Sequence, residues 1–581
     1  MFAILDIDYQ EGAITMTFSQ IPYHRADLDA WKAQIEDQTK RFQEAKTFEE
    51  ADAIYREAEL SSVEYDTMVT LASLRRDIDT RDPFYDAEST YYDEQMPTLQ
   101  PAFKAWTMAT LASPFRKELE EKYGSVPFVN AEMSTKTFSP EIVEDLQKEN
   151  ALTTRYNKLL ASAQIPFRGE VYTLSQLSPW KLDPDDEIRK EAWVAEGNWY
   201  NEHGAEFDEI YDELVKLRHS MGCKLGYGGY TQLGYLRMQR NCYGPEDIKK
   251  FRHAVQKYLV PVANKLYIHQ AQMQGRTFPM NFADSALAFK SGNPKPVGNP
   301  QEILAMGDKF YAELSEETDA FWKFMRQHEM LDVESKVGKS GGGYCTQIAS
   351  MRSPFIFANF NGTAHDVEVV THEAGHAFAA FVNRDRIPAS TIWPSMEACE
   401  VHSMSMEFFA WPWAEGFFGG DTRKFLYSHL KGALCFIPYG TMVDHFQHVV
   451  YAHPDFTPEE RHQVWRELLG LYMPWLKPGE IPFYGEGKAW QRQSHIYSMP
   501  FYYIDYCLAQ TVALDFWARI QEDAKEAFAT YLKYTKLGGT MFFTDMLQEA
   551  GLGNPFDEDT LRRICAAAQK WLENYDMTGI A

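Results

Sequence analysis

The sequence lacks any apolar run long enough to cross a membrane. Its first residues, MFAILDID, also lack the basic start and long apolar core of an export signal. The 7 cysteines are scattered, odd in number, and form no Cys-x-x-Cys pair. A disulfide framework is therefore not indicated, and reduced thiols in the cytoplasm are the simplest expectation.

Positive charge is also scarce. The chain has 57 Lys and Arg residues against 83 Asp and Glu residues, which gives a net charge of −26. Such a surface repels nucleic acids and anionic membranes, so neither is expected as a partner. Hydrophobic residues make up 45% of the 581 residues, enough for a large core. We expect a soluble protein that is a monomer or a small homo-oligomer.

A motif in the second half of the chain carries recognisable chemistry. Residues 372–376 read His-Glu-Ala-Gly-His. His372 and His376 are four residues apart, so on a helix they share one face and can bind one Zn²⁺. Glu373 between them is then placed to deprotonate a zinc-bound water. Residues 367–382 are apolar almost all round, which predicts a buried helix, and buried ionisable groups are costly unless they are paired or bind a metal.

A catalytic zinc takes three protein ligands and leaves one position open. Metzincins place a third histidine six residues after the second, but Val382 occupies that position here. The next predicted helix begins after Pro394 and offers four candidates: Glu397, Glu400, His402 and Glu407.

Position along this helix separates the candidates. Glu397 falls in the first turn, where the helix dipole favours a carboxylate in any case, so we expect it to support the site rather than bind metal. Glu400 lies one turn deeper and is the preferred third ligand. Glu407 lies seven residues further on the same face, which suits a hydrogen bond to a zinc-bound histidine. His402 is two residues from Glu400 and points elsewhere.

The histidine pair and the stretch Trp393–Phe409, WPSMEACEVHSMSMEFF, together resemble the thimet oligopeptidase and oligoendopeptidase F family of zinc peptidases. Within that family the stretch is most similar to the bacterial Pz-peptidase branch. The resemblance spans about residues 200–560. It implies Glu400 as the third ligand of one zinc ion per chain. It also implies a zincin-type, clam-like helical body with the zinc deep in a channel, and cleavage of short peptides rather than folded proteins.

The same resemblance points to groups that stabilise the transition state. An oxyanion formed at the scissile carbonyl needs donors besides the metal. The candidates are His495, Tyr502, Tyr503 and Tyr506. The resemblance matches Tyr506 to the donating tyrosine, with His495 as its helper. The flexible loop that the thimet branch forms with glycines is not carried over, because residues 496–500 contain no glycine.

A short, largely buried strand is predicted at residues 354–360, directly before the motif helix. A strand in this place can hold an extended peptide by edge-on backbone pairing. We therefore expect substrate contacts at Ala358 and Asn359, and at Gly343 and Tyr344 of the Gly-Gly-Gly-Tyr segment that precedes the strand.

The expected fold class is mainly α, with a small β-sheet edge beside the motif helix and a deep substrate channel. Residues from about 25 to 195 are rich in charge and helix formers and predict antiparallel amphipathic helices. Residues 178–186 form a turn-rich joint. We expect an N-terminal helical region, 1–195, as a wall of the channel, and a catalytic domain at 196–581.

Together these features predict a zinc-dependent endopeptidase that hydrolyses internal bonds of short, unstructured oligopeptides. The alternative within enzymes is a metallo-carboxypeptidase or dipeptidase of related helical fold, which needs a basic residue to clamp a substrate terminus. Outside enzymes, the alternative is an inactive zinc-containing peptide-binding protein. The intact Glu373 argues against that alternative, because structural zinc sites have four ligands and need no base.

Overall fold

The computed structural model describes residues 16–336 and 338–580. The chain divides into two compact units, unit 1 with residues 1–124 and 298–393 and unit 2 with residues 125–297 and 394–581. Neither unit ends at residue 195, and the division into a channel wall and a catalytic domain stays a prediction. The segment on which the export-signal prediction rests lies outside the described residues.

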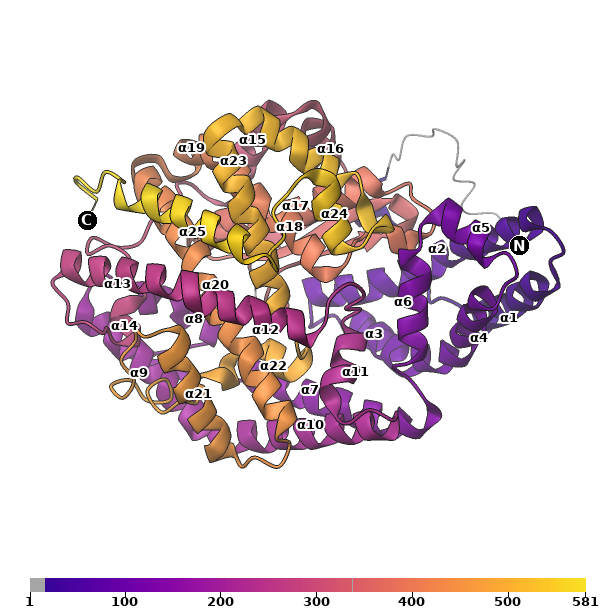
Figure 1. The fold of residues 1–581 in the computed structure, drawn as a ribbon, viewed down its shortest axis with the longest axis horizontal. Helices are drawn as coiled ribbons and strands as arrows, with labels where there is room; N and C mark the ends of the chain where they lie inside the picture. The colour runs from indigo at the N-terminus through magenta and orange to yellow at the C-terminus, as the bar shows by residue number, and fades with distance from the viewer. Residues whose placement is uncertain (1–15, 337, 581) are drawn as a thin grey trace. The chain divides into compact units, whose positions relative to one another are not determined.

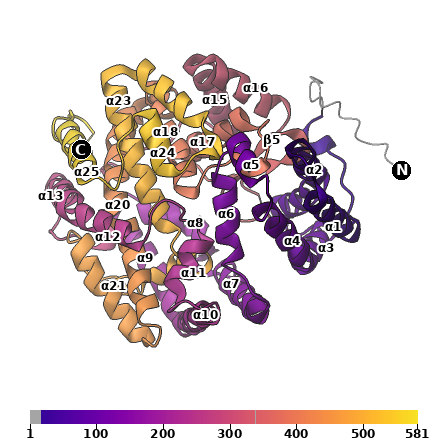
Figure 2. The ribbon, with the colours of Figure 1, turned by 45° about the vertical axis from the view of Figure 1, so that its right-hand side comes forward.

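Unit 1 combines N-terminal helices with a small sheet and the motif helix (Figure 1). Its main elements are α1 (Leu28–Glu44), α2 (Phe48–Ile78), α3 (Pro83–Gln95), α4 (Gln100–Leu111), α5 (Arg116–Tyr123), α15 (Pro300–Leu314), α16 (Glu316–Gln327), β3 (Leu331–Glu334), β4 (Tyr344–Ile348), β5 (Ser353–Phe360) and α17 (His365–Asn383). Figure 2 shows α1 to α4, drawn in indigo, packed together. Local capping defines where the helices begin: Asp27 accepts a hydrogen bond from the Ala30 N–H at the start of α1.

The three-stranded sheet of unit 1 has the order β3-β5-β4. Its central strand β5 is parallel to β3 and antiparallel to β4. Every residue of β5 except Asn359 is buried, as its continuous apolar run predicts, and α17 packs against it. Because β5 is paired on both sides, an extended substrate cannot add along its paired length. Among the described strands of this sheet, β3 and β4 form the edges, so edge-on pairing would have to use one of them.

Unit 2 is almost entirely helical, with one two-stranded hairpin. Its main elements are α6 (Val126–Thr135), α7 (Val143–Ala161), β1 (Ile165–Phe167), β2 (Glu170–Tyr172), α8 (Leu174–Leu177), α9 (Asp186–Glu202), α10 (Gly204–Lys224), α11 (Tyr230–Arg237), α12 (Pro245–Ala254), α13 (Val260–Gln274), α14 (Phe282–Ser285), α18 (Met396–Phe409), α19 (Ala414–Phe418), α20 (Thr422–Ala452), α21 (Pro458–Tyr472), α22 (Ser494–Ser498), α23 (Tyr503–Thr535), α24 (Phe543–Ala550) and α25 (Glu558–Glu573). A short π-helix at Val255–Leu259 joins α12 and α13, which run nearly end to end (Figure 1).

The core of unit 2 lies around α18, α20 and α23, because α23 packs against both of the other helices. All residues of α18 except Met396 and Glu407 are buried. A helix buried on nearly every side carries its polar residues only where they have partners, which makes the acidic residues of α18 informative. The prediction of a mainly α fold with a small sheet is confirmed.

Two further findings concern the whole described chain. In residues 16–336 and 338–580, no helix combines the length and apolar character that a membrane span requires. All seven cysteines are free thiols.

Candidate active site

Helix α17 follows β5 through a turn that a buried carboxylate holds in place. Asp366, 2% exposed, accepts hydrogen bonds from the N–H groups of Asn361 and Gly362, at 2.9 and 2.7 Å. These bonds fix the connection between the strand and the helix, so the position of the motif on α17 is set from the sheet.

The two histidines lie together on the accessible stripe of α17. Most of the helix before its last turn is buried. The exposed His365 and the partly exposed Glu368, Val369, His372 and His376 share one face. The imidazole centroids of His372 and His376 are 5.1 Å apart, with the ring planes at 83°. Glu373 is only 9% exposed. The sequence prediction of two histidines on one helix face is therefore confirmed.

Gly343 lies beside Glu373. A methyl group on its Cα would be 3.8 Å from Oε1 of Glu373 and 3.4 Å from the carbonyl oxygen of Phe357. These are ordinary van der Waals distances, so the backbone of Gly343 borders the space next to the glutamate without being crowded by it. The structure brings the backbone of Gly343, one of the four predicted substrate-contact residues, next to the motif glutamate.

The other three predicted contacts use their polar groups within unit 1. The Ala358 carbonyl accepts from Lys339 Nζ at 2.5 Å, and the Asn359 side-chain amide donates to the Ser340 and Gly342 carbonyls at 2.8 and 2.9 Å. Tyr344 donates its hydroxyl to Asp77 at 2.9 Å. The contacts of Ala358 and Asn359 hold the glycine-rich segment against β5, and the Tyr344 hydroxyl ties it to α2.

In unit 2, two hydroxyl groups orient the carboxylate of Glu400. Tyr502 donates to Oε1 at 2.8 Å and Ser403 donates to Oε2 at 2.9 Å. Glu400 is 4% exposed. Neutral donors on both oxygens fix the carboxylate plane without cancelling its charge, which is how ligands of metal ions are commonly oriented.

The other acidic residues of α18 have different partners. Glu397 accepts from the Ser395 hydroxyl at 2.8 Å, and its Oε2 lies 3.6 Å from the guanidinium of Arg240. Glu407 accepts from Nε2 of His429 at 2.8 Å.

The ring of His402 lies against aromatic residues of α23, with centroids 5.0 Å from Tyr534 and 6.1 Å from Tyr531. This location agrees with the prediction that His402 points away from Glu400.

The predicted histidine and tyrosine cluster is assembled within unit 2. The ring of His495 lies 5.7, 5.0 and 5.8 Å from the rings of Tyr502, Tyr503 and Tyr506. Burial raises the pKa of the Tyr502 hydroxyl well above its usual value, and the Glu400 carboxylate adds to the rise. Tyr502 therefore stays protonated and remains a donor.

His495 is poised to donate from one defined nitrogen. Burial lowers the pKa of its imidazole, against the opposing effect of Glu400, so the neutral ring is favoured. The Gln493 amide donates to Nδ1 at 2.9 Å, which leaves the proton on Nε2. The Tyr506 hydroxyl lies 3.5 Å from that Nε2.

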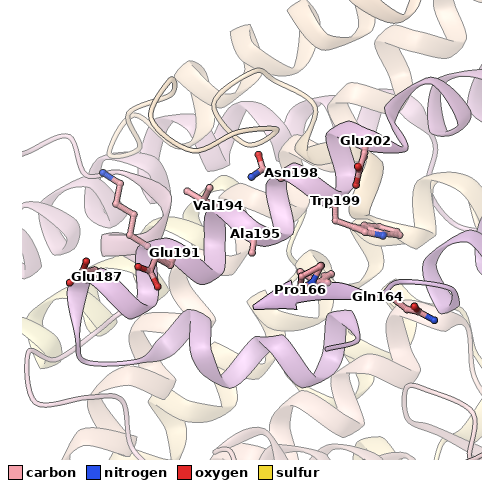
Figure 3. A pocket seen from close by; sticks show the side chains of 11 residues that line it. Gln164, Pro166, Glu187, Glu191, Val194, Ala195, Asn198, Trp199 and Glu202 are labelled. Carbon is pink, nitrogen blue, oxygen red and sulfur yellow. The ribbon is translucent and has the colours of Figure 1, made fainter. Parts of the chain in front are cut away.

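A separate cavity of about 600 Å³ lies on unit 2 between β1 and α9 (Figure 3). Its apolar lining includes Pro166, Val194, Ala195 and Trp199, and Glu202 is among its acidic residues. Its lining contains no histidine and none of the predicted site residues. We assign no part of the predicted chemistry to it.

Sequence reasoning missed two residues that hold the turn directly before the tyrosine cluster. Arg240 and Gln447 contact the backbone of Phe501, directly before Tyr502. Neither lies in a recognisable motif. The segment MQRNCY, which contains Arg240, does not show whether its arginine is buried or exposed, because that depends on partners elsewhere in the chain.

A helical chain that carries this histidine pair and glutamate on a helix packed against a small sheet has the architecture of a peptidase. The chain belongs to peptidase family M3. The peptidase M3 N-terminal domain matches residues 18–138, and peptidase family M3 matches residues 311–565.

Individual relatives cover nearly the whole chain. Oligopeptidase PepF of Bacillus subtilis (strain 168) is 21% identical over 605 aligned positions, which cover 98% of this chain and 85% of the relative. The solved structure of PZ peptidase A with inhibitor 2 is 44% identical, has a TM-score of 0.92, and is matched over 96% of this chain and 99% of its own. Oligoendopeptidase-F from Enterococcus faecium, at 14% identity and a TM-score of 0.60 over 94% and 98% of the two chains, shares the fold.

The position of Gly343 generates a first prediction. Gly343→Ala should fold normally, because the added methyl group meets only ordinary contacts. It should raise KM for a peptide substrate about tenfold, the low end of what one misfitting methyl group changes. The matched control is Gly341→Ala, whose methyl group would meet no atom within 4 Å. Steady-state kinetics and melting temperatures of the two variants decide the matter. Equal KM values for both variants would show that Gly343 does not border the substrate.

Proposed function

We propose that this peptidase is a zinc-dependent endopeptidase that hydrolyses internal bonds of short, unstructured oligopeptides in the cytoplasm. The observation that carries the proposal is the arrangement on α17. Two imidazoles share the accessible stripe of the helix, and Glu373 lies between them in sequence and beside the open backbone of Gly343. The name of one relative, oligopeptidase PepF, supports the choice of oligopeptides.

The proposed zinc ligands are His372 and His376 on α17 and Glu400 on α18. Two imidazole nitrogens and one carboxylate oxygen suit zinc, and three protein ligands leave the open position that catalysis needs. The orientation of Glu400 by Tyr502 and Ser403 supports this assignment. Bound zinc would polarise the scissile carbonyl and lower the pKa of the attacking water.

Glu397 is less suited to be the ligand, because the buried guanidinium of Arg240 already faces its carboxylate. We therefore keep Glu400 as the third ligand and leave Glu397 and Glu407 as supporting residues. The Glu407 carboxylate accepts from His429, and its hydrogen bond to a zinc-binding histidine stays a prediction.

The protein residues then divide the remaining tasks. Glu373 takes the proton from the attacking water and passes it to the leaving amine. The oxyanion needs a donor, and the Tyr502 hydroxyl is engaged with Glu400. Tyr506 is the proposed donor, with His495 as its helper through the proton on Nε2. Tyr503 contributes its ring to the wall of the cluster.

The base is tested by one substitution. Glu373→Gln should retain about one zinc per chain and lose peptide hydrolysis by several orders of magnitude, because the group that accepts and returns the proton is gone. Glu368→Gln is the matched control on the same helix and should keep near-normal activity. Metal analysis and turnover of a fluorogenic peptide are the measurements. Native turnover in Glu373→Gln would refute the proposed base.

The endopeptidase assignment is tested by substrate length. Peptides of about ten residues with both termini blocked should be cut at internal bonds, because zinc and Glu373 act on the scissile bond and need no free terminus. Mass spectrometry of a length series with free and blocked ends gives the cut positions. A strict requirement for a free carboxylate would favour the carboxypeptidase alternative, and ready cleavage of intact folded proteins would contradict the proposed substrate class.

A further inference from the structure

The backbone is strained at Phe501, immediately before the tyrosine that contacts Glu400. Phe501 has a φ of 69°, in the left-handed region that residues with a side chain avoid. It lies in the turn between α22, which carries His495, and α23, which begins at Tyr503. Such a conformation persists only where surrounding contacts hold it, and it is concentrated at functional sites.

Contacts from three other segments hold Phe501 in this conformation. Its N–H donates to Gln447 Oε1 at 2.9 Å, and its carbonyl accepts from Arg240 Nη2 at 2.7 Å. Its ring, 1% exposed, packs among four other rings: Tyr230, Tyr235, His448 and Tyr451.

Gly234 makes room for that ring. A Cβ at this position would lie 2.7 Å from Cδ2 of Phe501, so any side chain there would push the ring aside.

Arg240 connects this turn to α18 and α23, two of the helices that carry residues of the proposed site. Its side chain is 1% exposed. While Nη2 holds the Phe501 carbonyl, Nη1 pairs with Asp505 on α23 and lies 3.6 Å from Glu397 on α18. The planar guanidinium fixes these directions relative to one another, which a flexible lysine cannot do.

We propose that Arg240, acting on the strained carbonyl of Phe501, is a positioning residue that sets the first turn of α23 and thereby the placement of the Tyr502 and Tyr506 hydroxyls. The inference rests on the proposed function, because it assigns Arg240 a task only if those tyrosines serve peptide hydrolysis. Arg240 touches neither substrate nor metal in this account.

The competing explanation is that the contacts of Arg240 only stabilise the core of unit 2. The two explanations differ in a double-mutant cycle. If Arg240 and Phe501 act through the tyrosine hydroxyls, disturbing the turn should matter little once those hydroxyls are removed. If they only stabilise the fold, the disturbance should reduce activity by the same factor with or without the hydroxyls.

The experiment uses Gly234→Ala to displace the Phe501 ring without replacing Arg240 or Gln447, the residues that hydrogen-bond the Phe501 backbone. The variant is made in the native chain and in a Tyr502→Phe/Tyr506→Phe chain, and kcat, KM, zinc content and melting temperature are measured for all four proteins. In the native chain we expect kcat to fall about tenfold to a hundredfold with KM little changed, the range for a small misplacement of reacting groups. In the double-tyrosine variant we expect a change within about twofold, the scatter between independent sites.

Two further variants complete the test. Gly432→Ala on α20, whose methyl group would meet no atom within 4 Å, is the matched control and should leave kcat unchanged. If Gly234→Ala fails to fold, Arg240→Lys takes its place. Lysine keeps the positive charge beside Asp505 and Glu397 but lacks the second guanidinium nitrogen that also reaches Phe501. We expect the same loss of kcat in the native chain and the same small change in the double-tyrosine variant.

The outcomes are distinct. An equal fall of kcat in both backgrounds overturns the positioning role, and so does a silent Gly234→Ala or Arg240→Lys in a chain whose tyrosine variants are crippled. Full activity of the double-tyrosine variant overturns the oxyanion role in the proposed function and the positioning role together. Loss of kcat confined to the background that retains both hydroxyls is the result we expect.

Discussion

Ionisable groups on a helix that is otherwise buried are the constraint on which the rest of the site depends. Helix α17 packs against the central strand β5, and before its last turn only one stripe of it is accessible to solvent. His372 and His376 occupy the end of that stripe, and Glu373 is almost fully enclosed. Burial of a carboxylate beside two imidazoles is unfavourable unless opposite charge or hydrogen bonds compensate it. In the proposed function, a bound cation would supply opposite charge beside the imidazoles, and the buried glutamate would act as the base.

On α18, two buried glutamates have different hydrogen-bonding and ionic partners. Glu397 faces the guanidinium of Arg240, a permanent cation, and shares it with Asp505. Glu400, one turn later, is oriented by the hydroxyls of Tyr502 and Ser403. A carboxylate fixed by neutral donors keeps its charge available for a metal, whereas one beside arginine is already compensated. The physical difference between these residues therefore lies in their donors rather than in their depth on the helix.

Some of this could be predicted from sequence because the signals are local. The motif helix, the buried strand before it and the helix after Pro394 all follow from hydrophobic pattern and breaker residues over short windows. The central position of β5 could not, because it depends on β3 and β4, whose short sequences carry weak patterns. The hydrogen bond from the Tyr502 hydroxyl to Glu400 could not be predicted either, because Tyr502 lies in the turn before α23 and its place depends on how that turn is held. Arg240, which contacts this turn at Phe501, lies far away in the chain and in no motif.

X-ray absorption at the zinc edge of the purified protein tests whether His372, His376 and Glu400 hold one zinc ion. We expect about one zinc per chain with only nitrogen and oxygen ligands, two of them imidazoles. We also expect Glu400→Gln to lose the metal or change the spectrum, and Glu397→Gln to leave both unchanged. A protein without zinc, a sulfur ligand, or a spectrum that responds to Glu397→Gln and not to Glu400→Gln would contradict this ligand assignment.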